Sequence, residues 1–140
     1  MNEAERLAEV ERNLCGLVSG TARLIEDHVR ERAAKLGLTA PQASALRELA
    51  GPMTLRELSD RMGCEPSNAT FIADKLEGLG LIERHPHPRD RRAKRLVLTP
   101  EGQALRERLL DLLSAHSPLA ALSPQEQETL RDLLLRAHGS

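Results

Sequence analysis

The chain has 140 residues, of which 40% are hydrophobic and 29% charged, a composition typical of a single globular domain. Phe71 is the only residue among Phe, Trp and Tyr, so the core must be aliphatic, and the many Leu and Ala residues favour helices. Two cysteines give no disulfide framework, and no apolar run suits a signal peptide or a membrane span. We therefore expect a cytoplasmic protein with no membrane partner.

The net charge of −1 is unevenly distributed along the chain. Residues 84–95 contain six arginines or lysines and one acid, Asp90, and so carry +5, which leaves −6 for the rest. A basic segment of this kind is typical of a loop that contacts phosphates, although an isolated charge run is more often a solvated loop. The neighbouring elements decide between these two interpretations.

A long helix is predicted over residues 3–35, because apolar residues recur there at steps of three and four. The resulting stripe comprises Leu7, Val10, Leu14, Leu17, Val18, Leu24, Ile25 and Val29. Such a helix would extend about 45 Å, which is more than a domain of this size needs. We therefore expect part of its stripe to pack on a second copy of the chain.

Two shorter helices follow, and each begins with a capping box, in which a threonine and a Gln or Glu three residues later satisfy each other's backbone N–H groups. One begins at Thr39 and the other at Thr54. The apolar residues predicted to face inward are Ala43, Leu46 and Leu49 in the first helix, and Leu55, Leu58 and Met62 in the second. A turn at Gly63 then leads into another helix.

This next helix is expected to have Glu65 at its cap and Pro66 at its first position, where the missing N–H costs nothing. It ends at Gly78 and Gly80. Its predicted inward face comprises Ala69, Ile72, Ala73, Leu76 and Leu79. The alternation of residues predicts strands over 81–85 and 95–99, separated by a basic, proline-containing loop.

Two Leu-rich helices complete the chain, one from Thr99-Pro100 and one from a capping box at Ser123. The pattern predicts a mainly α fold with a small β-wing, that is, a winged helix-turn-helix with long terminal dimerisation helices. We expect residues 1–140 to form a single domain, with the winged helix over 39–99 and the dimerisation region over 1–38 and 100–140.

A helix fits the major groove of B-form DNA, where short polar side chains at its start reach the base edges. Ser67, Asn68 and Thr70 provide such a set. Asn68 could bond adenine bidentately, Thr70 could contact a thymine methyl or a phosphate, and Lys75 is better placed for the backbone. A polar helix start with no partner is the alternative, which the adjoining basic loop disfavours.

The loop between the strands contains Arg89, Arg91, Arg92, Lys94 and Arg95 beside two prolines. Arginine gains from the negative potential of a narrow minor groove. Asp90 cannot favour phosphate, and we expect it to hold a neighbouring arginine through an ion pair. The run follows a helix-turn-helix and lies between two strands, so we predict a DNA-binding wing.

The segments PSNATFIADKLEGLGLIER and DRRAKRLVLTPEG, with the order of helices, resemble the MarR family of bacterial winged-helix regulators along almost the entire chain. The resemblance implies a homodimer, interlocked through its first, fifth and sixth helices, on a pseudo-palindromic operator, most simply as a repressor. It matches Ser67, Asn68 and Thr70 to the base-reading positions, and Asp90 and Arg92 to the wing pair. Phe71 departs from the polar residue common in the family, and could pack on thymine methyls or against the wing.

The resemblance also implies a small-molecule effector, which the sequence does not identify. VERNLCGLVSG resembles the first helix of the peroxide-sensing branch, with Cys15 at the reactive position. The tyrosines that assist that thiol are absent, and a buried, inert cysteine is the usual alternative. His85 and His87 form a possible metal pair, but solvation or phosphate contact suits their place in the wing better, so we expect no metal and no cofactor.

The sequence also bears on two other classes of function. An enzyme is disfavoured, because the chain contains no Gly-rich phosphate loop, nucleophile elbow, His-Glu-x-x-His motif or CxxC pair. A winged helix that binds protein rather than DNA remains open. Such a module does not need five cations in its wing, so the salt dependence of binding distinguishes the two.

Overall fold

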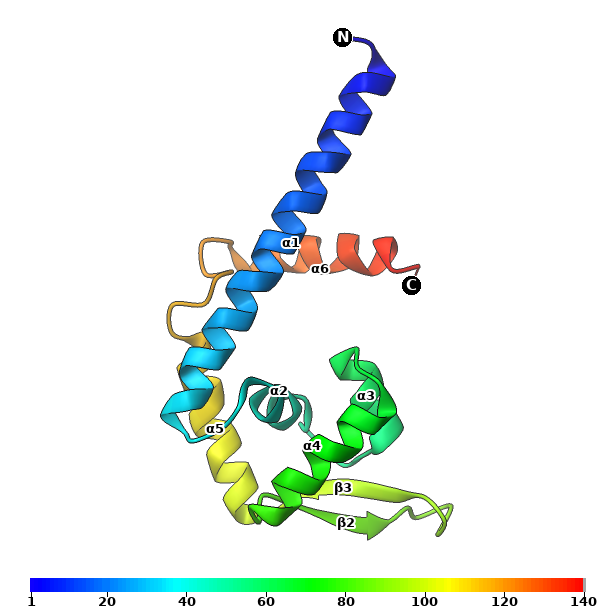
Figure 1. Cartoon of the computed structure of the whole chain (residues 1–140), viewed down its shortest axis with the longest axis vertical. Helices are drawn as coiled ribbons and strands as arrows, with labels where there is room; N and C mark the ends of the chain where they lie inside the picture. Colours follow the sequence, from blue (N-terminus) through cyan, green and yellow to red (C-terminus); the bar gives the residue numbers. More distant parts are fainter. Residues whose placement is uncertain (140) are drawn as a thin grey trace. The chain divides into compact units, whose positions relative to one another are not determined.

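The computed structural model describes residues 1–139, and the chain divides into two compact units. One unit comprises residues 29–114, and the other is formed by residues 1–28 and the segment from Ala115 onward. In the described part of the chain, no helix is long and apolar enough to cross a bilayer. The expected mainly helical fold with a small sheet is confirmed (Figure 1).

The elements follow each other in the order that the sequence predicts. The helices are α1 (Glu3–Lys35), α2 (Ala40–Glu48), α3 (Leu55–Met62), α4 (Pro66–Gly78), α5 (Pro100–Ser114) and α6 (Pro124–Ala137). The strands are β1 (Met53–Thr54), β2 (Ile82–Pro86) and β3 (Lys94–Leu98), in one antiparallel sheet of order β1-β3-β2. The two predicted strands are shifted by one residue, and β1 is not predicted because two residues are too few to show an alternating pattern.

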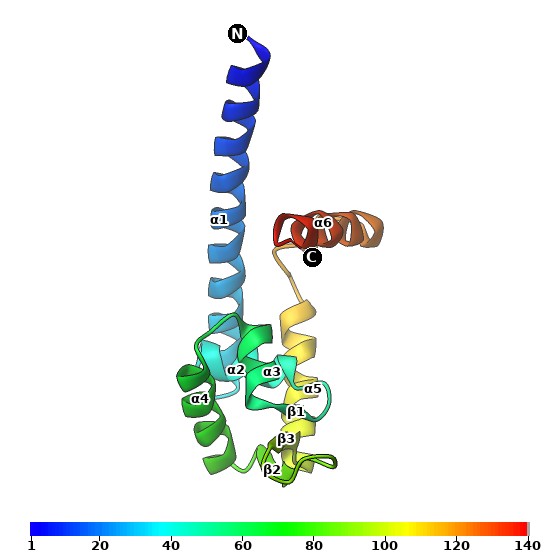
Figure 2. The ribbon, with the colours of Figure 1, turned by 90° about the vertical axis from the view of Figure 1, so that its right-hand side faces the viewer.

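The larger unit packs α2, α3, α4 and α5 with the small sheet around an aliphatic core (Figure 2). The largest fully buried side chains are those of Leu46, Leu49, Leu58, Leu76, Ile82, Leu96 and Leu109. Leu96 of the central strand β3 pairs with Met53 of β1 on one side and Arg84 of β2 on the other. The core therefore holds the two strands of the wing against the helices that precede it.

Three residues are less buried than the sequence suggests. Leu79 is wrongly predicted to face inward; its side chain is 56% exposed, because α4 ends at Gly78 and Leu79 has already left the helical repeat at the C-cap. Leu55 and Met62 lie at the two ends of α3 and are only half-buried. Predicting burial from periodicity assumes that the helix continues, so the prediction is least accurate at helix ends.

A tight junction joins β3 to α5 and to the end of α4. The Thr99 hydroxyl donates to the Gly80 carbonyl (2.7 Å) and accepts the N–H of Gly102 (3.0 Å). A Cβ on Gly102 would collide with the carbonyl of Leu81, so no larger residue fits there without a backbone shift. Thr99 and Gly102 therefore fix where α5 starts relative to the turn between α4 and β2.

One arginine of α5 secures the end of α2. The Arg106 guanidinium donates to the carbonyls of Leu46 and Arg47, with the shortest contact 2.9 Å from Nη2 to Arg47. The last carbonyls of a helix lack intrahelical partners, and a cation satisfies both their hydrogen bonding and the helix dipole there. α5 is thus tied to α2 as well as to the end of α4.

The unit formed by the chain ends exposes an unusual amount of apolar surface. On α1 the exposed side chains are those of Leu7, Val10, Leu14, Leu17, Val18 and Leu24. On α6, which begins with the predicted Ser123 capping box, Leu133, Leu134 and Leu135 are exposed and no described residue is fully buried. Solvent-exposed apolar stripes of this length mark contact surfaces in soluble proteins.

Candidate nucleic-acid interface

The predicted base-reading residues lie on the outer face of α4. Its inner face packs Ala69, Ile72, Ala73 and Leu76 into the core. The exposed residues that are candidates for DNA contact are Ser67, Asn68, Thr70, Phe71 and Lys75. The helical repeat therefore separates a packing face from a solvent face, as the sequence pattern requires.

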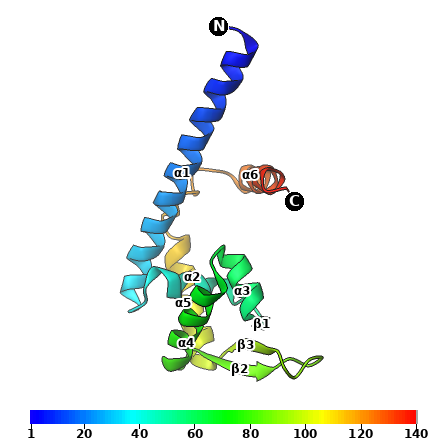
Figure 3. The same ribbon diagram turned by 45° about the vertical axis from the view of Figure 1, so that its right-hand side comes forward.

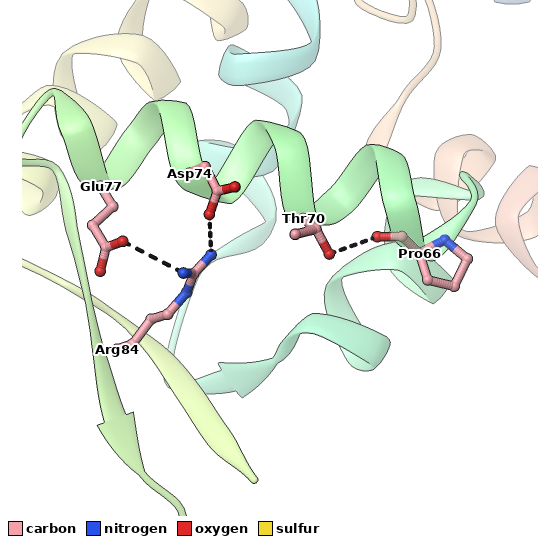
Figure 4. Close-up of polar contacts among 5 residues, drawn as sticks. All are labelled: Pro66, Thr70, Asp74, Glu77 and Arg84. Atoms are coloured by element: carbon pink, nitrogen blue, oxygen red, sulfur yellow. Dashed lines mark hydrogen bonds and ion pairs between the residues drawn. The ribbon is translucent and has the colours of Figure 1, made fainter.

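The start of α4 differs from the starts of α2, α3 and α6. Those three helices have complete capping boxes, whereas Glu65 makes no side-chain cap bond at α4. Pro66 occupies the first turn, and its carbonyl accepts the Thr70 hydroxyl at 3.0 Å (Figure 4). Neither the Glu65 nor the Thr70 side chain accepts the backbone N–H of Ser67, which can therefore bond an external acceptor. The N-terminus of a helix favours an anion at this place.

Arg84 joins β2 to the outer side of α4, a role that the sequence does not reveal. Its Nη2 lies 2.7 Å from Asp74 Oδ1, and its Nη1 lies 3.5 Å from Glu77 Oε1 (Figure 4). Asp74 and Glu77 are one turn apart on α4 and so present both carboxylates to one strand residue. By sequence Arg84 belongs to a predicted strand and to the basic segment 84–95, but in the structure it neutralises two acids of α4.

The loop of the wing is closed by its own backbone. The N–H of His87 donates to the carbonyl of Ala93 at 3.0 Å, and the N–H of Ala93 donates to the carbonyl of Asp90 at 3.1 Å. Asp90 Oδ1 accepts the N–H of Arg92 at 3.0 Å. This is the local side-chain-to-backbone bond by which aspartate shapes turns. The expected ion pair of Asp90 is wrong, since Asp90 makes none within residues 1–139.

The remaining cations of the wing face solvent. Arg89, Arg91, Arg92 and Lys94 are exposed, and in the part of the chain that the structure describes none of them is in an ion pair. Arg95 is half-buried opposite Thr54 of β1. The tip of the hairpin extends beyond the helices of its unit (Figure 3). Four positive side chains are therefore free to meet an anionic surface.

The outer side of α4 and the hairpin are neighbours. A groove of about 420 Å³ lies where they meet, lined by Thr70 of α4, Arg84 of β2 and Lys94 of β3 and also by residues 54–56 at the start of α3. The strands and the helix are further joined by the Arg84 ion pairs. The polar start of the helix and the cationic wing are thus parts of one continuous unit.

Phe71, the only residue among Phe, Trp and Tyr, is 63% exposed on α4. The Nζ of Lys75, one turn later, lies 5.3 Å from the centroid of its ring, a cation–π distance. Packing of Phe71 against the wing, one of the two expected roles, is wrong because the ring remains in solvent. The other role, contact with a base methyl, is still a prediction.

Both cysteines are free, and the two histidines of the wing have local partners. Cys15 is exposed on α1 and Cys64 is half-buried before α4. His85 Nε2 lies 2.9 Å from Glu83 Oε2, and His87 Nδ1 accepts the N–H of Arg89. Across residues 1–139, no group of three His, Cys, Asp or Glu side chains is arranged to hold a metal ion.

A known protein family matches the part of the chain that forms this winged helix. The model of the MarR family matches residues 38–94, which run from just before α2 to the start of β3. An HTH-type transcriptional regulator of Bacillus subtilis, YsmB, is 30% identical over 131 residues, which cover 92% of this chain and 78% of YsmB. The chain belongs to the MarR family. This is a family of transcriptional regulators rather than of enzymes, and its winged helix is a DNA-binding element.

Solved structures of MarR proteins have the same fold. Wild-type MarR of E. coli in its apo form superimposes with a TM-score of 0.70 at 26% identity, over 89% of this chain and 95% of that protein. CouR of Rhodococcus jostii RHA1, solved with bound p-coumaroyl-CoA, gives 0.72 at 27% identity, over 84% of this chain and 86% of CouR. The likeness thus extends well beyond the matched winged helix, into the helices at the two ends of the chain.

Proposed function

We propose that this MarR-family chain is a sequence-specific regulator that binds a pseudo-palindromic DNA operator as a homodimer. One observation carries the proposal: a helix with an exposed polar start and a hairpin with four exposed cations belong to the same unit, where Thr70 of the helix and Lys94 of the hairpin line one groove. A major groove accepts the helix, and the adjacent backbone and minor groove attract the cations. The protein would act in the cytoplasm, where the bacterial chromosome lies.

Each exposed residue has a proposed role that follows from its chemistry. Asn68 can bond a base bidentately, and Ser67 can bond a base edge or a phosphate through its hydroxyl and its N–H. Thr70 presents its methyl while its hydroxyl is held by Pro66. The phosphate and minor-groove contacts come from the wing and the later part of the helix: Lys75, Arg89, Arg91, Arg92 and Lys94, with Asp90 shaping the loop.

A homodimer explains the apolar surface of α1 and α6. An operator with two half-sites is matched by a protein with a two-fold axis. The exposed Leu and Val side chains of α1 extend from Leu7 to Leu24, a stretch that a symmetric partner would cover. We therefore assign residues 1–38 and 100–140 to dimerisation and residues 39–99 to DNA binding.

Repression released by a small molecule is the proposed mode of regulation. A dimer bound across a promoter occupies duplex that a polymerase needs, so occupancy alone represses. CouR, with its bound acyl-CoA, is a neighbour in which a small molecule is held by this fold. A thiol response through Cys15 is the alternative, because that side chain is exposed on α1; peroxide should then release DNA from the wild type but not from Cys15→Ser.

The test is titration of a labelled duplex from the upstream region of its own gene, at several salt concentrations. Since each phosphate contact releases a counterion, we expect affinity to fall steeply as salt rises. Arg92→Ala should weaken binding to all sequences, whereas Asn68→Ala should mainly relax preference at one base pair in each half-site, by about tenfold. A winged helix that binds only protein would show no salt-dependent DNA binding, and that result would overturn the proposal.

A further inference from the structure

An exposed aromatic ring lies within the proposed DNA-reading face. Phe71 is 63% exposed although it is the only Phe, Trp or Tyr of the chain, and the ammonium group of Lys75 lies over its ring. Burial of an aromatic ring gains more free energy than burial of a smaller aliphatic side chain, because more apolar area leaves water. A single exposed ring on a proposed binding surface is therefore informative. This ring is available to an external partner.

The position of the ring on α4 is that of a base-contacting residue. Phe71 lies three residues after Asn68 and four after Ser67, and residues at these spacings lie on one strip of helix surface. The first two turns of a recognition helix are the part that reaches base edges. Lys75 continues the strip, and its ammonium group covers one face of the ring at 5.3 Å.

The chemistry of the ring restricts what it can recognise there. Phenylalanine has no donor or acceptor, so it cannot use the hydrogen-bonding pattern of the groove. The C5-methyl group of thymine is the apolar feature that distinguishes base pairs in the major groove. We propose that Phe71 recognises a thymine methyl in each half-site of the operator, with Lys75 binding a nearby phosphate. The inference rests on the proposed function and names the base feature read at this site.

Replacing thymine by uracil in the operator tests this contact alone, because uracil pairs as thymine does and lacks only the methyl group. A duplex is selected from a random-sequence pool with the full-length protein, and each thymine of a half-site is then replaced by uracil in turn. At one position per half-site we expect about a fourfold loss of affinity, and about fifteenfold when both half-sites are changed, from the methyl area that leaves water.

Phe71→Ala should bind the thymine and uracil duplexes equally. The substitution is at an exposed helix position and replaces Phe with the best helix former, so the fold is retained. Leu79→Ala is the matched control, because it truncates another exposed apolar residue of this region, at the C-cap of α4. This control should keep the full uracil penalty of the wild type.

The outcomes separate the inference from the function on which it rests. If the wild type binds its selected duplex but tolerates uracil at every thymine, or if Phe71→Ala keeps the same penalty, the methyl contact is overturned and the DNA-binding function stands. If no sequence is enriched from the pool, the proposed function fails and the inference fails with it. A penalty at one position that only Phe71→Ala removes supports the inference.

Discussion

A single carboxylate shapes the end of the wing. Asp90 lies among exposed cations, yet its Oδ1 accepts the backbone N–H of Arg92 and its carbonyl accepts that of Ala93. Side-chain oxygens of Asp and Asn favour turns through such bonds, irrespective of charge. The sequence places an acid in a basic loop but cannot tell an ion pair from a turn, because both use the same residue type.

The turn and the charge of Asp90 can be separated by substitution. Asp90→Asn keeps an acceptor oxygen and removes a negative charge beside four cations, so we expect affinity for duplex DNA to rise about twofold to fivefold at low salt. Asp90→Ala loses the acceptor and should lower affinity instead. Fluorescence anisotropy of a labelled operator measures both. Equal losses in the two variants would mean that the charge itself is needed.

At the scale of elements, most of the winged helix follows from local signals in the sequence. Capping boxes at Thr39, Thr54 and Ser123 define helix starts through bonds between residues three apart, and the structure contains all three. Contacts between elements have no such signal. The Arg84 ion pairs span seven and ten residues, and the hydrogen bonds from Arg106 to backbone carbonyls span 59 and 60. Residue type and position in α4 or the wing predict the exposed site residues, and their contacts with DNA stay a prediction.

The Arg84 ion pairs between β2 and α4 should contribute more to DNA affinity than to the free energy of unfolding. Arg84→Met removes the cation from Asp74 and Glu77, and leaves two carboxylates unpaired beside the DNA-facing surface. We expect DNA affinity to fall about tenfold, while the free energy of unfolding changes by about 1 kcal/mol or less, because the acids are largely exposed. Operator titration and urea denaturation measure the two effects.

A charge-matched variant checks the explanation. Adding Asp74→Asn and Glu77→Gln to Arg84→Met removes the unpaired carboxylates and should restore most of the lost affinity. If the triple variant binds as weakly as Arg84→Met, then Arg84 acts through its own contact with DNA, and neutralisation of the helix acids is not its role.

At the scale of the whole molecule, the apolar stripe of α1 is the surface on which the proposed homodimer depends. Its exposed leucines and valines extend over several turns, and nothing in the described chain covers them. A two-fold axis would double the effect of any change there, since each residue occurs twice in a symmetric interface. Two linked winged helices also bind two half-sites with a higher effective concentration than separate chains.

Leu14→Glu places a charge within the stripe and should shift the protein from dimer to monomer at micromolar concentration, with at least a tenfold loss of operator affinity. Sedimentation equilibrium measures the assembly, and anisotropy measures the binding. Arg12→Glu is the control, because at 100° per residue it lies opposite the stripe and should leave the dimer intact. A Leu14→Glu variant that remains a dimer would contradict the assignment of α1.

The junction around Thr99 has a mechanical consequence. The Thr99 hydroxyl bonds both the turn after α4 and the first turn of α5. Gly102 of α5 lies so close to the carbonyl of Leu81 that a Cβ would not fit, and Arg106 bonds the same helix to the end of α2. A tilt of α5 must therefore also move the turn that ends α4, because Thr99 is bonded to both. If the chain binds an operator as proposed, a rotation of α5 would be transmitted to α4 without unfolding of the turn between them.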